Sequence, residues 1–505
     1  MNLKSSKTEI SYYLFSFLLL FVTNPIAFSN PYYDNNSNIR LAHQNIYALR
    51  PFTVENLLQA EELKNPGNGY IAYYRLYNEI ITLIISNSTE EFRKTKPVLD
   101  QYLKKLRELP SNTPEYRLLL GEAYVFTGLI NVKYDNEVSG FIDCIKGYKL
   151  LEDNAQKYPS FEPGYKMLGL IEIGVAFLPR VLQNGAKLFN IKSDSQEGLK
   201  RLYNFSEFAK GKPGYEEEAL FFTLGAYRLM NGEESAMKLI NREIDNFKEF
   251  AILNFFAATV CVQANAVETA LTLLSKITPE KIEINFPPLL YLKGKTKLMR
   301  LDQDADVVLL NYLKTSSGKD YVKTILYDLA CFYYISGNTK EYLSYIEKVK
   351  EEGREFLARD VEAAFEARKT EFPNIYMMRA DFLLRGGYFL QAEEELSDID
   401  NINTLKDNEK VHYHYLRGEC FRLRNNVRQA ESEYLNAVLL GKISGNYIAQ
   451  KALVNSGLMM EKNSLKNEAE KYYNSCLQFD AISNPYSDIY KNKARAGLIR
   501  LSLYE

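Results

Sequence analysis

The chain has 505 residues, of which 46% are hydrophobic and 25% are charged. This balance is that of an ordinary globular protein, and the length suits roughly two to four domains or one long repeat array. The net charge of -2 provides no general positive field, so the composition argues against binding to nucleic acid or to an acidic membrane surface.

The N-terminus has the layout of a signal peptide. Lys4 and Lys7 precede an almost uninterrupted apolar or aromatic run over residues 12–22, and Ala27 and Ser29 supply small residues before a cleavage point. The run is short for a membrane span of about 20 residues. We therefore expect residues 1–29 to direct export to the periplasm or cell envelope, close to a membrane. An uncleaved N-terminal membrane anchor is the alternative.

Residues 30–69 are interrupted by Asn, Pro and Gly, so we expect a partly mobile leader with one short helix over 53–63. An N-terminal helical region follows over residues 70–213. Its clearest helices are predicted over 92–109, over 115–127, where Gly128 is expected to end the helix, and over 137–157. Ser88 and Thr113 are placed to cap the helices that follow them, and a further helix is expected to start within Ser193-Asp194-Ser195-Gln196, where either Asp or Ser can be the cap.

The segment 164–202 is the least regular part of the chain. Gly169 lies in an apolar helix that is broken at Leu178-Pro179, and an amphipathic stretch then leads to Asp194 and Gly198-Leu199. The segment resembles the signature of the eukaryotic family that includes tetratricopeptide repeat protein 39 and the yeast inclusion-body clearance protein. That family has a Gly-Phe-x-Gly-Asp turn where this chain has Asn190-Ile191-Lys192-Ser193 before Asp194. The resemblance implies an all-helical scaffold and does not name a ligand.

Small residues recur along residues 214–505, after a break at Lys210–Gly214. They are Gly225, Ala258, Gly294, Ala330, Ala380, Gly418 and Gly457. Most steps are close to the unit of about 34 residues in a tetratricopeptide (TPR) repeat, and the best-preserved unit, residues 411–440, resembles that helix-turn-helix motif. The longer step from Ala330 to Ala380 predicts an extra helix over 351–368. Gly232, Gly337 and Gly387 are predicted at turns that need a positive φ.

The sequence thus predicts an all-α protein. It combines a divergent N-terminal helical region with a right-handed, TPR-like solenoid of helical hairpins over residues 214–505. A last amphipathic helix over 488–504 is expected to cap the array.

Chemistry-bearing residues are sparse. His412 and His414 are two apart, so a helix points them to different sides, and no phosphate-binding loop, zinc motif or paired acid and base is present. We therefore expect no catalytic residue, metal or cofactor. The five cysteines are scattered in helical patterns as small buried residues, and the sequence leaves open whether any of them pair.

An aromatic position repeats three residues before each small residue, where a TPR stack would line its concave groove. Six of its seven members are aromatic or Met: Phe222, Phe255, Tyr291, Tyr327, Met377 and Tyr415. Polar neighbours on the same side include Lys295, Asp381, Glu419 and Arg422. Such a groove suits an extended peptide or a partner helix. The alternative is that these aromatic residues pack within the repeats.

These patterns favour a non-enzymatic scaffold of the cell envelope or periplasm that binds a protein or peptide partner. A carrier of lipid or another apolar ligand, built on the Gly-rich apolar segment 164–189, is the second hypothesis. An enzyme is the third.

Overall fold

The computed structural model describes residues 31–178, 180–355, 357–399, 401–479 and 485–503. Within these ranges the regular secondary structure is helical throughout, which confirms the predicted all-α class. The predicted signal peptide lies outside the described residues. Among the helices that are described, none combines the length and the apolar character needed to cross a membrane.

The segment expected as a partly mobile leader is folded. After a short 3₁₀ turn at Pro31–Tyr33 it forms α2 (Ser37–Tyr47) and α3 (Pro51–Lys64), which pack on α4 (Gly69–Ser86). Ile39, Ala42 and Ile46 are fully or almost fully buried. Their spacing of three and four residues is that of a helix face, a signal that the flanking Asn and Pro residues obscured.

Glycines join α6 (Pro114–Lys133) to α7 (Glu137–Lys157) at close range. The helix predicted to end at Gly128 continues to Lys133, so that prediction is wrong. A Cβ on Gly128 would lie 2.7 Å from the carbonyl oxygen of Gly140, and one on Gly147 would lie 2.5 Å from that of Gly121. Gly128 therefore does not end a helix, and its role is to let the backbones of α6 and α7 come into contact. The predicted bounds of α7 match the structure.

Glycines also allow close packing of α8 (Tyr165–Phe177) against α10 (Ser195–Ala209). The short helix α9 (Arg180–Leu188) lies between these two in the sequence. A Cβ on Gly169 would lie 2.7 Å from the carbonyl oxygen of Gly198. Helix α10 starts where predicted, and of the Asp and Ser residues expected there Asp194 is the cap, because its Oδ1 accepts from the Glu197 amide at 2.9 Å. Within the irregular segment, α8 and one face of α10 are therefore tightly packed parts of the core, whereas the end of α9 and the turn after it are exposed.

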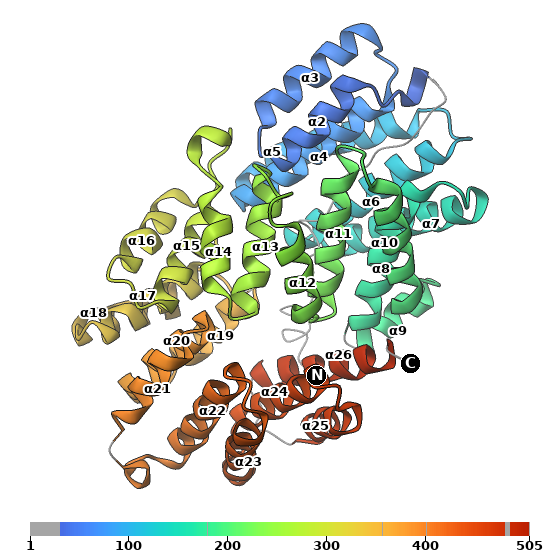
Figure 1. The fold of residues 1–505 in the computed structure, drawn as a ribbon. Helices are drawn as coiled ribbons and strands as arrows, with labels where there is room; N and C mark the ends of the chain where they lie inside the picture. Colours follow the sequence, from blue (N-terminus) through green and yellow to red (C-terminus); the bar gives the residue numbers. More distant parts are fainter. Residues whose placement is uncertain (1–30, 179, 356, 400, 480–484, 504–505) are drawn as a thin grey trace.

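Successive helices then contact each other in pairs. The first and second helices of each pair are α11 (Tyr215–Leu229) and α12 (Glu233–Glu243), α13 (Ala251–Gln263) and α14 (Val267–Ser275), α15 (Pro287–Met299) and α16 (Ala305–Thr315), α17 (Val322–Ile335) and α18 (Thr339–Glu351), α20 (Ile375–Gly386) and α21 (Phe389–Ser397), α22 (Asp407–Leu423) and α23 (Val427–Ser444), and α24 (Ile448–Lys462) and α25 (Lys466–Gln478). Figure 1 shows them following one another along an arc.

The turn glycines behave as predicted at two of three positions. Gly337 and Gly387 have φ values of 80° and 92°. At the α11–α12 turn, Asn231 adopts the positive φ of 50° and Gly232 has an ordinary negative φ. Asn tolerates the left-handed region better than most residues, so it can replace Gly there.

The extra helix predicted over 351–368 is present as α19 (Ala358–Glu366), which contacts α17 and the C-terminal helix. Its buried Asp360 caps α17 from outside that helix. The carboxylate accepts from the amide of Tyr321 at 2.8 Å, and from the amide and hydroxyl of Thr324 at 2.9 and 2.8 Å. This contact fixes α19 beside the first helices of the array.

The C-terminal helix α26 (Pro485–Leu503) has two roles. It packs on α24 and α25, where a cap was predicted, and it also contacts α8 and α19 (Figure 1). Arg500 forms the link: its guanidinium pairs with Glu461 at 2.8 Å and donates to the carbonyl oxygen of Met230 at 2.7 Å. The end of the array is thereby joined to its beginning, and the helices enclose a central space.

Candidate functional site

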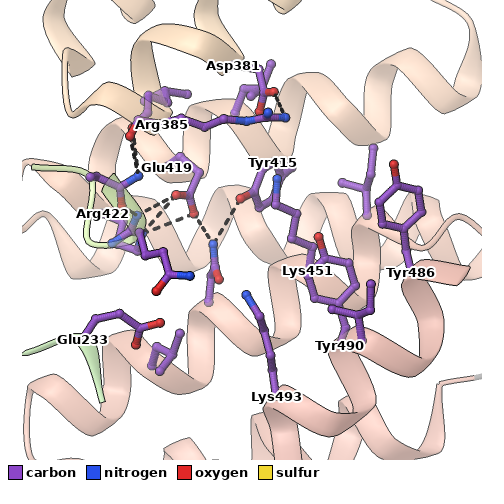
Figure 2. Close-up of a pocket in the computed structure, with 18 of the residues that line it drawn as sticks. Glu233, Asp381, Arg385, Tyr415, Glu419, Arg422, Lys451, Tyr486, Tyr490 and Lys493 are labelled. Carbon is purple, nitrogen blue, oxygen red and sulfur yellow. Dashed lines mark hydrogen bonds and ion pairs between the residues drawn. The ribbon is translucent and has the colours of Figure 1, made fainter. Parts of the chain in front are cut away.

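A large chamber of about 2020 Å³ lies in this central space. Residues of α12, α15, α17, α19, α20, α22, α24 and α26 line it, together with one or two residues each of other helices such as α10 and α18 and with turns at the ends of α11, α13 and α22. Small-molecule sites usually measure about 300–1,000 Å³, so this chamber is larger than a single small ligand requires. Figure 2 shows part of its wall.

The structure divides the predicted groove residues into two groups. Seven of the ten line the chamber: Lys295, Tyr327, Met377, Asp381, Tyr415, Glu419 and Arg422. The other three, Phe222, Phe255 and Tyr291, lie in the buried core and do not line it. Phe255 packs on Phe286 with ring centroids 4.8 Å apart, and Tyr291 stacks on Tyr321 at 4.4 Å. For these three residues the packing alternative describes the structure.

Glu419 is the centre of a hydrogen-bonded group on one wall. Its carboxylate pairs with Arg422 at 2.6 Å, and it accepts from the hydroxyl of Tyr434 and from the amide of Asn455. Burial acts to raise the pKa of Glu419, but Arg422 outweighs it, so the pKa lies below its ordinary value. Glu419 is therefore ionised and fully engaged by its donors.

Asp381 is held in a similar way. Arg385, one turn later on α20, forms an ion pair with it. Burial acts to raise the pKa of Asp381, and the neighbouring charges of Arg385 and Lys451 outweigh it and lower the pKa. His412 lies near this pair, and burial lowers its pKa to about 4, so the imidazole is neutral at pH 7.

Several lining residues were not predicted: Arg385, Lys451, Asn455, Tyr490 and Lys493. The ammonium group of Lys451 lies 4.3 Å from the centre of the Tyr415 ring. The seventh member of the repeated position is Val454, three residues before Gly457. Lys451 lies one turn before Val454 on the same helix face, so its position could have been found from the repeat pattern. Lys493 belongs to the cap, and only the closure by α26 brings it to the chamber.

A second charged pair lies on the wall formed by α15 and α17. Lys295 donates to the hydroxyl of Tyr291 at 3.1 Å, and burial lowers the pKa of Lys295 to about 8. Burial also raises the pKa of Asp328, although Lys295 and nearby arginines oppose this effect. Both groups are thus less readily ionised than they would be in water.

Basic side chains outnumber acidic ones among the lining residues, whereas the whole chain has a net charge of -2. Among the described residues, no group of three His, Cys, Asp or Glu side chains could hold a metal ion. The five cysteines, whose pairing the sequence left open, are free thiols in the structure and form no disulfide with one another. Burial raises the pKa of Cys331, the thiol that lines the chamber, so it is protonated and a poor nucleophile.

The wall therefore offers aromatic edges, ammonium groups and hydrogen-bond donors, which are the groups of a binding surface. The chain was also compared with known proteins. No protein-family model and no curated protein matches it.

Proposed function

We propose that the protein is a non-enzymatic scaffold that binds an extended segment of a protein partner in its central chamber. The size of the chamber carries this proposal, because about 2020 Å³ exceeds what a single small molecule needs. Tyr327, Tyr415 and Tyr490 line the wall together with charged groups, and such mixtures anchor peptides by aromatic contacts and orient them by charge.

In this proposal the helix pairs form a right-handed, TPR-like solenoid with its first helices facing inward. The contacts between small and large residues support it. A Cβ on Gly418 would lie 2.5 Å from the ring of Tyr434, and one on Gly457 would lie 2.4 Å from the ring of Tyr473, one pair later. The basic and apolar N-terminus supports a location at the cell envelope or in the periplasm.

The carrier of lipid or another apolar ligand has less support. It requires an open apolar pocket within residues 164–189. Met167, Leu170 and Ile173 of α8 are fully buried, and α8 packs on α10 and α11. Side chains thus occupy the space around α8, which disfavours a lipid there.

The proposal can be tested by selecting binders from a library of random peptides displayed on phage. The bound position is then read by hydrogen–deuterium exchange of the protein with and without a recovered peptide. Slower exchange is expected in α20, α22 and α24, and unchanged exchange in α16 and α21, which contribute no lining residue. Failure to recover any peptide, or protection confined to the outer helices, would contradict the proposal.

A further inference from the structure

Two carboxylates of the wall shown in Figure 2 are already neutralised within the protein. Asp381 is paired with Arg385, and Glu419 is paired with Arg422 and also accepts from Asn455 at 2.5 Å. Each pair has no net charge, and His412 is neutral at pH 7. The charge that this part of the wall presents to a ligand therefore comes from other groups.

The other charged groups labelled in Figure 2 are Glu233, whose charge acts on Arg500, and two lysines, Lys451 on α24 and Lys493 on α26. Neither lysine side chain has an ion pair or hydrogen bond to any part of the chain that the structure describes, and their one ring contact is that of Lys451 with Tyr415. Figure 2 shows Lys493 reaching from α26 toward the part of the chamber that Lys451 and Tyr415 also face. They are close enough for the charge of Lys493 to act on Lys451, whose pKa is lowered mainly by burial.

Two like charges that face the same partly enclosed space repel each other. The neighbouring carboxylates Asp381 and Glu419 attract Lys451, but each is already paired with an arginine, so an anion placed near both lysines relieves the remaining repulsion. This inference rests on the function proposed above, the binding of a polypeptide segment. We propose that the bound segment is acidic and places a carboxylate between Lys451 and Lys493. Tyr490 lines the chamber beside this position and is partly exposed, so it offers apolar surface to the neighbouring residues of the segment, whereas Tyr415 is almost fully buried against Lys451. The carboxylate belongs either to an Asp or Glu side chain or to the C-terminus of the bound chain.

Four synthetic peptides of four Glu-Tyr-Ala or Gln-Tyr-Ala repeats, each with a free or an amidated C-terminus, separate these sources. Each carries a fluorophore at its N-terminus, and anisotropy titrations give its dissociation constant. The amidated Glu peptide is expected to bind at least about tenfold more tightly than the amidated Gln peptide. The free Gln peptide recovers affinity only if the C-terminal carboxylate is also bound.

The double variant Lys451→Gln/Lys493→Gln is expected to lose this preference. The matched control, Lys442→Gln/Lys471→Gln, removes two exposed lysines of α23 and α25 and should keep it. The substitutions remove only the contact of Lys451 with the Tyr415 ring and its attraction to Asp381 and Glu419, so the variant's melting temperature should change little, and a melting curve checks this. A preference that survives in the variant, or equal binding of all four peptides, would overturn the acidic segment. Equal binding accompanied by protection of α22 and α24 would leave the polypeptide scaffold standing.

Discussion

At the scale of single residues, the contact between Gly418 and Tyr434 is a sensitive point. Gly418→Leu is expected to lower the free energy of unfolding by about 1–3 kcal/mol, because a side chain there would overlap the fully buried Tyr434 ring. Urea denaturation followed by circular dichroism measures the change. An unchanged midpoint would contradict the close packing of α22 on α23.

Gly185 provides the matched control for this substitution. It lies inside α9, and a Cβ added there meets no atom within 4 Å. Gly185→Ala is therefore expected to stabilise the protein by up to about 1 kcal/mol, whereas Gly418→Ala should destabilise it. The two glycines cannot be distinguished by residue type, and only their neighbours separate them.

Residue patterns identified the candidate site in part. Tyr327, Met377 and Tyr415 line the chamber as the repeat predicts, but Phe222 and Phe255, at the equivalent positions, do not. The repeat fixes which helix face a residue occupies. It does not show what covers that face, and for Phe255 the cover is Phe286, from a connecting segment outside the repeat pattern. Sequence periodicity alone could not have separated the two groups.

At the scale of elements, one buried carboxylate makes the polar connection between α19 and the start of α17. Asp360→Ala removes three hydrogen bonds and leaves the buried amide of Thr324 and the start of α17 without an acceptor. We expect a loss of about 2–4 kcal/mol in the free energy of unfolding. Chemical denaturation measures it, and hydrogen exchange should be faster in α19 and the first turn of α17 than in α22.

Asp407→Ala is the control for this variant. Asp407 begins α22 in the sequence much as Asp360 lies near the start of α19, but its side chain is 88% exposed and its salt bridge to Lys410 is long, at 3.5 Å. Its replacement should change stability by less than about 0.5 kcal/mol. Similar losses in the two variants would show that Asp360 does not have the special role assigned to it.

Helix boundaries were predictable where a polar cap marks them, as at Asp194, and less so at glycines. Gly128 was interpreted as a helix end, although Gly121 and Gly128 are seven residues apart and Gly140 and Gly147 repeat that spacing on the next helix. Residues seven apart share a helix face, so the two pairs together indicate a close crossing. A single glycine carries no such information, because the same residue suits a turn and a contact.

At the scale of the whole molecule, closure of the array was not predictable from local patterns. The cap was recognised from its amphipathic sequence, but the bond from Arg500 to the carbonyl oxygen of Met230 joins residues 270 positions apart. Such a contact depends on the summed curvature of all the helix pairs between them. Closure also positions Lys493, so the charge of the chamber depends on a long-range feature of the fold.

Arg500→Met tests this closure. The variant keeps the apolar stem of the side chain but leaves Glu461, whose side chain is only 14% exposed, without its partner. Removing one member of a largely buried pair typically costs about 3–5 kcal/mol. We expect α26 to separate from α8, with a larger radius of gyration in small-angle X-ray scattering and faster hydrogen exchange in α26, while the helical circular dichroism signal is largely kept.

Because Lys493 would leave the chamber with α26, the Arg500→Met variant should also lose the preference for a carboxylate-bearing peptide. Lys491→Met, on the same helix, should change none of these properties. An unchanged radius of gyration together with a lost preference would show that Arg500 acts on the chamber without holding the array closed.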